Sequence, residues 1–300
     1  MNNLKHYFSA IAAFVIWGFF PWVLKSLSEY ASGEILYFRI LFAAGLLLVI
    51  VFVFRRKVFR KDIEFLTTQP TSVRRMLIVN LLIGGALLTV NWLIFIYTVN
   101  EVNIRTASFS YLVCPVLTAV MGYLMLNENL SRLQWFAVGL CAASCTMIGL
   151  SSVSELGYSL STALTYGLYL VMQRKGSQLD RINVLCVQIL FSFLLLCIFY
   201  VYLVKTVPTT GDFYVTIIII AAIFTVLPLF LNLFALLKVN SATVGILMYI
   251  NPLFNFTIAI FIFNEQITTL QFVGYMIILV ALIAFNYPYF IKIRSMAINR

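Results

Sequence analysis

The sequence predicts an all-α integral membrane protein in which ten transmembrane helices form two inverted five-helix repeats. Two observations predict this class: the composition and an internal repeat. Of the 300 residues, 63% are hydrophobic and 10% are charged, whereas a soluble domain carries about 25% charged residues. Because a membrane-spanning helix needs about 20 apolar residues, the apolar content suffices for ten helices joined by short loops. No loop reaches the roughly 50 residues of a small soluble domain.

Ten apolar segments follow one another along the chain, and each is long enough to cross a bilayer. They cover residues 7–28, 33–54, 76–99, 104–126, 132–150, 155–173, 182–204, 213–237, 241–263 and 268–290. The first segment has no small-x-small cleavage site behind it, so we interpret it as a retained first helix.

Positive charges lie almost entirely in alternate loops. With the N-terminus in the cytoplasm, 16 Lys and Arg residues fall on the cytoplasmic side, and only Lys25, Arg105 and Lys205 fall outside. This split follows the positive-inside rule and predicts a multi-pass protein of the cell inner (plasma) membrane with both termini cytoplasmic. The net charge of +10 is thereby explained by topology and contact with anionic lipid, so we expect no nucleic-acid partner.

The internal repeat consists of residues matched at an offset of 137 positions. The matched pairs are Pro115 with Pro252, Asn127-Glu128 with Asn264-Glu265, and residues 131–134 with 268–271. The last pair predicts two helix-starting capping boxes. A weaker match at an offset of 149 pairs Trp17-Gly18 with Tyr166-Gly167. The chain thus divides into 1–150 (helices 1–5) and 151–300 (helices 6–10). Because five is odd, the second copy is inverted, as in many secondary transporters.

Several of these motifs resemble the drug/metabolite transporter superfamily. They are Trp17-Gly18 with Pro21, the stretch from Glu34 to Arg39, Asn91-Trp92 and the two Pro-to-Glu blocks. Within the superfamily the chain is similar to EamA-type permeases, closest to the RarD-like branch, over nearly its whole length. The resemblance implies ten helices in two inverted EamA-like repeats. It also implies secondary transport, often export, of a small metabolite such as an amino acid.

Four positions depart from the RarD-like pattern towards lower polarity. Phe38, Thr106, Cys114 and Met248 stand where that pattern has His, Glu, Asn and Gln. If these positions line the transport pathway, the cargo should be less polar than that of the relatives.

Arg39 is the only charged residue well inside an apolar segment. Polar groups at that depth cost free energy and are therefore candidates for a functional site. One interpretation is a clamp for a carboxylate or phosphate group of the substrate. The other is that the side chain snorkels to the headgroups or pairs with Glu34. The sequence leaves both open.

Other polar and aromatic residues near segment centres complete the predicted substrate-binding set. Asparagines beside glycine or proline breaks can bind a substrate or satisfy freed carbonyls. Each aromatic residue taken singly is more often packing than ligand, but together they predict a pocket wall. The asparagines are Asn91, Asn232 and Asn251, and the aromatic residues are Trp17, Tyr111, Tyr166, Tyr169 and Tyr249.

The matched prolines and acids are predicted to have structural or gating roles because they lie at helix breaks and helix ends. They are Pro115, Glu128, Pro252 and Glu265. No Asp, Glu or His lies at mid-helix, and the only histidine, His6, precedes the first segment. We therefore expect no enzyme activity, no cofactor and no metal site. Transport is expected to be facilitated diffusion or exchange, or to be coupled through acids at helix ends such as Glu34.

These observations predict a carrier that works by alternating access around a midplane cavity bounded by helices 1, 3, 4, 6, 8 and 9. Its expected partners are a small-molecule substrate and the lipid bilayer. The alternative is a membrane scaffold, a scramblase-like protein or a signalling subunit without solute transport. The sequence does not indicate an oligomeric state and is compatible with a monomer.

Overall fold

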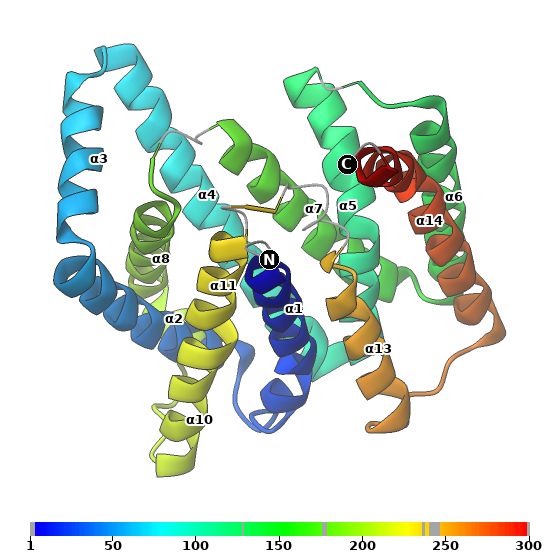
Figure 1. Cartoon of the computed structure of the whole chain (residues 1–300). Coiled ribbons are helices and arrows are strands. Elements are labelled where there is room, and N and C mark those ends of the chain that lie inside the picture. The colour runs from blue at the N-terminus through cyan, green and yellow to red at the C-terminus, as the bar shows by residue number, and fades with distance from the viewer. Residues whose placement is uncertain (1–3, 128, 176–178, 236–237, 240–246, 299–300) are drawn as a thin grey trace.

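A computed structural model describes residues 4–127, 129–175, 179–235, 238–239 and 247–298, and Glu128 lies outside them. Within those ranges every regular element is a helix (Figure 1). In chain order they are α1 (Leu4–Lys25), α2 (Ser32–Val49), η1 (Ile50–Phe54), α3 (Arg56–Thr68), α4 (Thr71–Tyr97), η2 (Thr98–Val102), α5 (Ile104–Leu126), α6 (Arg132–Ser151), α7 (Val153–Lys175), α8 (Arg181–Ile198), α9 (Tyr200–Leu203), α10 (Gly211–Ala221), η3 (Ala222–Val226), α11 (Leu227–Ala235), α13 (Ile250–Phe261) and α14 (Thr269–Ile298). The elements η1, η2 and η3 are wider π-helical turns that continue the preceding α-helices.

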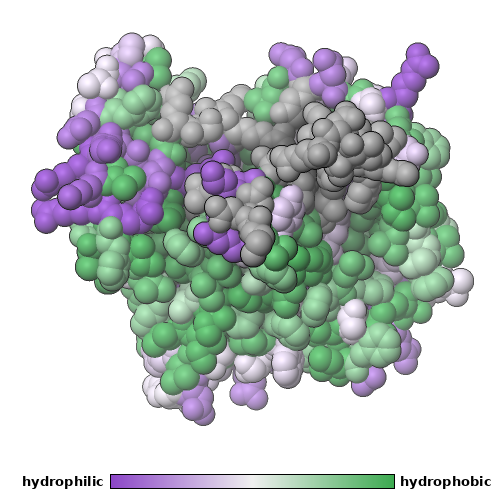
Figure 2. All heavy atoms as spheres, in the orientation of Figure 1, coloured by the Kyte–Doolittle hydropathy of each residue, from purple (hydrophilic) through white to green (hydrophobic). Residues whose placement is uncertain are grey.

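Eight helical segments are long and apolar enough to cross a membrane. They correspond to eight of the ten predicted segments. The other two correspond to α7, which is rich in Ser, Thr and Tyr, and to α13, which is apolar and has 12 residues. Figure 2 shows a broad hydrophobic band, with a hydrophilic cluster at the upper left and smaller hydrophilic groups at the upper right and along the lower edge. The all-helical membrane class is therefore confirmed.

The helix α3 is an element that the sequence prediction missed, because it is polar and none of its residues is buried. It stands at the upper left of Figure 1, where Figure 2 shows a hydrophilic cluster. Arg55, just before it, forms an ion pair with Asp180 (Nη2–Oδ2 2.7 Å), and Asp62 accepts a hydrogen bond from Asn183 Nδ2 at 2.6 Å. These contacts hold α3 against the start of α8. We call this end of the bundle the basic end, and the opposite end, where α1 ends and α2 begins, the far end.

The packing of α1 is matched by the packing of α7. Helix α1 lies against α11 and α13, whereas α7 lies against α4 and α5. At Gly18 in α1, an added Cβ would lie 2.5 Å from Phe254 Cβ of α13. At Gly167 in α7, it would lie 3.0 Å from Thr118 Oγ1 of α5. Gly18 and Gly167, which the sequence pairs at an offset of 149, thus both lie at close approaches between helices.

The helix ends also recur at the offset of 137. Among the described residues, Asn127 and Asn264 are the two non-glycine residues with positive φ, at 53° and 50°, a conformation that Asn tolerates better than most residues. Each precedes a capping box. Gln134 N and Gln271 N donate to the hydroxyls of Ser131 and Thr268 at 3.3 and 3.2 Å, and each glutamine accepts the return bond from the cap N–H. Both predicted capping boxes are confirmed.

The apolar core has two large clusters, and each contains helices from both halves of the chain. One joins α1, α2 and α4 to α8 and α10. The other joins α5 and α6 to α7 and α14. The two halves therefore interleave in space. A cavity borders the first cluster and is lined by residues of both halves.

Candidate substrate cavity and far-end polar network

The cavity, about 70 Å³ in volume, is lined by residues from both halves of the chain. The sequence-predicted residues that it brings together are Trp17, Arg39, Tyr111, Tyr166, Tyr169 and Asn251. The other lining residues are Phe14, Phe20, Leu88, Trp92, Phe95, Thr225, Leu229 and Met248. The described wall is thus aromatic and apolar, with Arg39 as its one charged side chain. Arg39 adds α2 to the six helices predicted to bound the cavity.

Arg39 is held in place without an acidic partner in the described part of the chain. The side chain is 3% exposed, and its Nε donates to Thr225 Oγ1 at 2.9 Å. Its guanidinium carbon lies 4.7 Å from the Phe20 ring centroid and 4.8 Å from that of Trp92, a cation–π arrangement. Glu34 accepts instead from the backbone N–H of Thr206 and of Ala31. The interpretation that Arg39 snorkels to the headgroups or pairs with Glu34 is therefore wrong.

The position of Thr225 follows from a helix break. Pro228 has no N–H, so it cannot satisfy the carbonyl of Phe224 four residues earlier. The helix widens there into η3, and Trp17 Nε1 donates to the freed Phe224 carbonyl at 3.1 Å. Thr225 Oγ1 bonds back to the Ile220 carbonyl at 3.0 Å. The break thus places a hydroxyl beside Arg39 and fixes the Trp17 ring at the cavity wall.

Tyrosines from two adjacent helices form the opposite wall. The Tyr111 ring meets Tyr166 edge-on, with centroids 5.8 Å apart. Tyr166 in turn stacks on Tyr169 at the same centroid distance. Phe95 packs against Tyr111 from α4, with centroids 5.4 Å apart. Such contacts keep large side chains in fixed positions, so this wall is preformed.

Three of the predicted binding residues do not line this cavity. Asn91 is fully buried, and its Nδ2 donates to Thr162 O at 2.8 Å and Thr165 Oγ1 at 3.1 Å, which ties α4 to α7. Tyr249 packs against the second core cluster. Asn232 lies in α11, and its buried Oδ1 has no hydrogen-bond partner within the described ranges.

The four less polar positions are dispersed. Only Met248 lines the cavity. Phe38 packs edge-on against Phe213 and Tyr214, and Cys114 is fully buried in the second core cluster. Thr106 lies at the start of α5. Only one of the four positions therefore still supports the prediction of a less polar cargo.

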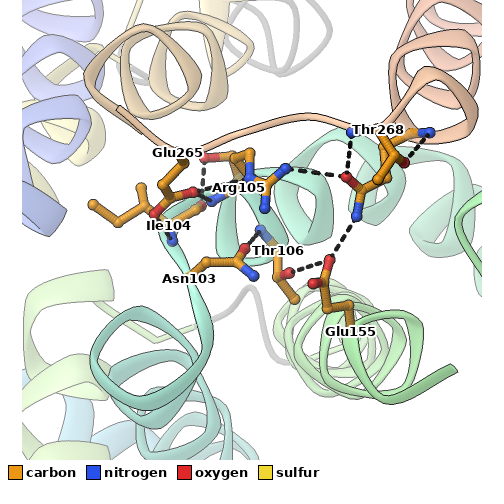
Figure 3. A network of polar contacts seen from close by, with 9 residues as sticks. Asn103, Ile104, Arg105, Thr106, Glu155, Glu265 and Thr268 are labelled. Carbon is orange, nitrogen blue, oxygen red and sulfur yellow. Dashed lines mark hydrogen bonds and ion pairs between the residues drawn. The ribbon is translucent and has the colours of Figure 1, made fainter. Parts of the chain in front are cut away.

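A second polar cluster lies at the far end and contains Glu265 and Arg105 (Figure 3). The Glu265 carboxylate accepts the backbone N–H of Ile104 at 2.8 Å and of Arg105 at 3.1 Å, which caps the start of α5. It also forms an ion pair with Arg105 (Nε–Oε2 3.1 Å). Carboxylates are stabilising at helix N-termini because of the helix dipole.

Further residues extend this cluster to α7 and α14. Arg105 Nη1 donates to Gln271 Oε1 at 3.0 Å, and Gln271 Nε2 donates to Glu155 Oε2 at 3.1 Å. Thr106 Oγ1 donates to the same Glu155 oxygen at 3.3 Å. We call Arg105, Thr106, Glu155, Glu265 and Gln271 the far-end network. It links the starts of α5, α7 and α14.

The other predicted structural or gating residues lie nearer the cavity, apart from Glu128, which is outside the described residues. Pro115 lies inside α5, about one turn from the cavity residue Tyr111. Pro252 lies in the first described turn of α13, directly after the cavity residue Asn251.

Sequence reasoning missed two groups of residues. Thr225 and Phe20, which hold Arg39 together with Trp92 of the Asn91-Trp92 motif, were not singled out. Only the Pro228 break three residues after Thr225 could have indicated the position of Thr225. In the far-end network, Arg105 and Glu155 were not singled out. The bonds from Arg105 to Glu265 and from Gln271 to Glu155 join residues more than a hundred positions apart, so no local pattern shows the pairing.

A family model described as the EamA-like transporter family matches this chain twice, over residues 4–150 and 154–287. An uncharacterized transporter of Vibrio cholerae is 31% identical over 284 residues, covering 92% of this chain and 90% of its own. The protein RarD of Escherichia coli K12 is 27% identical, covering 92% of each chain. An uncharacterized transporter of Bacillus subtilis, YojE, is also 27% identical.

A solved crystal structure at 11% sequence identity shares the fold, with a TM-score of 0.63 over 93% of this chain and 95% of its own. The twofold family match covers most of the sequence, and the relatives align over nearly their whole lengths. The chain therefore belongs to the EamA-like transporter family, in the RarD-like branch of the drug/metabolite transporter superfamily.

Proposed function

We propose that this membrane transporter is a secondary carrier that moves a small metabolite by alternating access around the cavity. The observation that carries the proposal is the position of the cavity, where helices of both halves meet. In carriers built from inverted repeats, the substrate site lies at the repeat interface. The twofold recurrence of helix ends, capping boxes and glycine contacts supports a fold of ten helices in two inverted repeats, 1–150 and 151–300.

The far-end network serves as the gate on one side of the cavity. It links the starts of α5, α7 and α14, so it must break or shift if these helices separate. Of the predicted gating residues, Glu265 has the most direct role. Pro115 and Pro252 adjoin lining residues, where a helix break allows bending.

The basic end faces the cytoplasm, with both termini, and the protein resides in the inner membrane. This orientation follows the positive-inside rule. Cysteines introduced singly at Thr67 and Thr209, both exposed, test it with a membrane-impermeant maleimide on intact cells. Labelling of Thr209→Cys above the wild-type background, without labelling of Thr67→Cys, is the expected result. The reverse pattern would overturn the orientation.

Transport proceeds by facilitated diffusion or by exchange. The described cavity wall contains no carboxylate or histidine that could carry a proton. Export is the proposed direction, on the family resemblance. The cargo binds among Trp17, Arg39, Tyr111, Tyr166, Tyr169 and Asn251.

Reconstitution into liposomes tests the carrier function. Vesicles would be loaded with a mixed metabolite pool, and solute loss would be followed by mass spectrometry. Leu88→Phe narrows the cavity, whereas Leu124→Phe makes the same change at a residue that is 70% exposed. The proposal expects saturable loss of particular solutes, reduced in Leu88→Phe and retained in Leu124→Phe. Loss equal to that of protein-free vesicles, or lipid scrambling without solute movement, would overturn it.

A further inference from the structure

We propose that the cargo is a small organic monoanion. Arg39 binds its anionic group, its body is apolar or aromatic, and it carries no cationic group. This inference rests on the proposed function, because it names the class of molecule that the carrier moves.

The first observation is a guanidinium with an unused hydrogen-bond donor. Arg39 Nε donates to Thr225 Oγ1, but Nη1 is buried and has no partner among the described residues. The two ion pairs of the described chain involve Arg55 and Arg105, not Arg39. An arginine remains charged in proteins, and a buried charge without a partner is costly. A bound carboxylate-type group would supply the missing partner, and Arg can bind it through two parallel hydrogen bonds.

The acid nearest to Arg39 in the sequence has other partners. Glu34 lies five residues earlier, at the start of α2. Its carboxylate accepts from Thr206 N at 3.1 Å, Thr206 Oγ1 at 3.2 Å and Ala31 N at 3.3 Å. These bonds tie α2 to the segment after α9. Glu34 is therefore not the counter-ion of Arg39.

The charge balance of the wall selects one negative charge. Arg39 is the one charged side chain among the described lining residues. A monoanion would neutralise it, whereas a dianion would leave one charge uncompensated in a site of low polarity. An amino acid would bring an ammonium group as well. The described wall offers that group neutral acceptors, such as Asn251 Oδ1, but no carboxylate to balance its charge. A small organic acid without an amino group fits this balance.

The neutral part of the wall selects an apolar body. The rings of Phe20 and Trp92 hold the guanidinium by cation–π contact without neutralising its charge. Phe95 and the three tyrosines present further aromatic surface to the same cavity. A buried water needs about 10–15 Å³ of volume measured in the same way. A cavity of about 70 Å³ therefore has room for about five to seven groups of the size of a water molecule. That space suits a short acid, and a ring requires modest widening.

Binding to the purified full-length protein tests the proposal with two matched sets of probes. The first set is propionate, propionamide and alanine; the second is phenylacetate, phenylacetamide and phenylglycine. Within each set the shape is similar and the charge differs. We expect the carboxylate of at least one set to bind about tenfold or more tightly than its amide and its amino acid. We expect this preference to disappear in Arg39→Met.

A second measurement excludes a trivial loss of folding. Without added anion, Arg39→Met should melt at or above the wild-type temperature, because it removes a buried charge that lacks a partner. Arg105→Met, made in a paired arginine outside the cavity, should melt lower. Arg39→Lys retains the charge but loses the planar fork, so it should bind the carboxylate more weakly than wild type and more tightly than Arg39→Met.

Several outcomes would overturn the inference. They are equal binding of an amide or amino acid, unchanged carboxylate binding in Arg39→Met, no binding by any probe, or melting of Arg39→Met as low as that of Arg105→Met. Failure of this inference can be distinguished from failure of the carrier function. Saturable, Leu88-dependent transport of a neutral or zwitterionic solute would leave the carrier standing and discard the monoanion.

Discussion

Two buried arginines of this molecule have opposite surroundings. Arg105, in the far-end network, donates through Nε to Glu265 and through Nη1 to Gln271. Arg39, in the cavity wall, donates through Nε to the neutral hydroxyl of Thr225, and its buried Nη1 has no partner in the described chain. Both side chains are mostly buried, at 8% and 3% exposed. The difference therefore lies in pairing and not in depth.

The difference separates a structural charge from one available to a ligand. Removing one member of a buried ion pair leaves the other uncompensated and is strongly destabilising. Removing a buried charge that has no counter-ion relieves a desolvation cost instead. Sites that bind ligands often sacrifice stability in this way. The comparison therefore assigns Arg105 to the gate and Arg39 to the cargo.

The largest expected effect comes from breaking the paired site. Glu265→Ala should destabilise the protein by about 3 kcal/mol or more, because Arg105 and two backbone N–H groups lose their acceptor. Thermal unfolding of the purified protein measures this, with the exposed Glu101→Ala as the control that should change little. Equal melting temperatures for the two variants would show that the far-end network contributes no stability.

Equivalent glutamines at the offset of 137 sharpen the comparison. Gln134 and Gln271 both complete capping boxes, but only Gln271 also binds Arg105 and Glu155. Gln271→Met should therefore cost about 2 kcal/mol, against about 1 kcal/mol for Gln134→Met. Melting temperatures of the two variants decide this. If Gln134→Met lowers the melting temperature more than Gln271→Met, the bonds of Gln271 to Arg105 and Glu155 do not add the expected stability.

The cavity wall depends on the close approach of α1 to α13. Gly18→Ala should cost about 1–2 kcal/mol, because its Cβ would meet Phe254 Cβ at 2.5 Å. Gly45→Ala provides the control, since nothing lies within 4 Å of the added carbon. Unfolding of both variants measures the difference. A Gly18→Ala protein as stable as Gly45→Ala would contradict this packing.

The smallest expected effect concerns the one polar bond that holds Arg39. Thr225→Val should cost about 1 kcal/mol of stability, because it removes the acceptor of Arg39 Nε. Thr89→Val is the matched control, since that buried hydroxyl bonds only the Gly85 carbonyl of its own helix. Thr225→Val should also weaken carboxylate binding, and Thr89→Val should not. The reverse order in a binding assay would break the link between Thr225 and Arg39.

The parts of this account that the sequence could predict depend on local patterns. Apolar length predicts the membrane helices, and Ser131 and Thr268 predict the capping boxes, because a cap is complete within four residues. The predicted aromatic residues Trp17, Tyr111, Tyr166 and Tyr169 meet at one cavity because they lie near the centres of helices that pack together.

The remaining features depend on partners distant in the sequence. The sequence shows Arg39 and Glu34 five residues apart, but Glu34 binds the N–H of the neighbouring Ala31 and of Thr206, which is 172 positions away. Asn91 binds α7, 71 positions away, as part of the packing. The helix α3 was missed for another reason: it is polar, so a search for apolar segments passes over it.

The most direct test of the account is counterflow in proteoliposomes. Vesicles loaded with unlabelled phenylacetate or propionate would take up the same labelled acid from outside, with protein-free vesicles as background. The account predicts uptake above background in wild type and Leu124→Phe, and background uptake in Arg39→Met. Equal uptake by wild type and Arg39→Met would show that Arg39 does not receive the charge of the cargo, and would contradict the central claim.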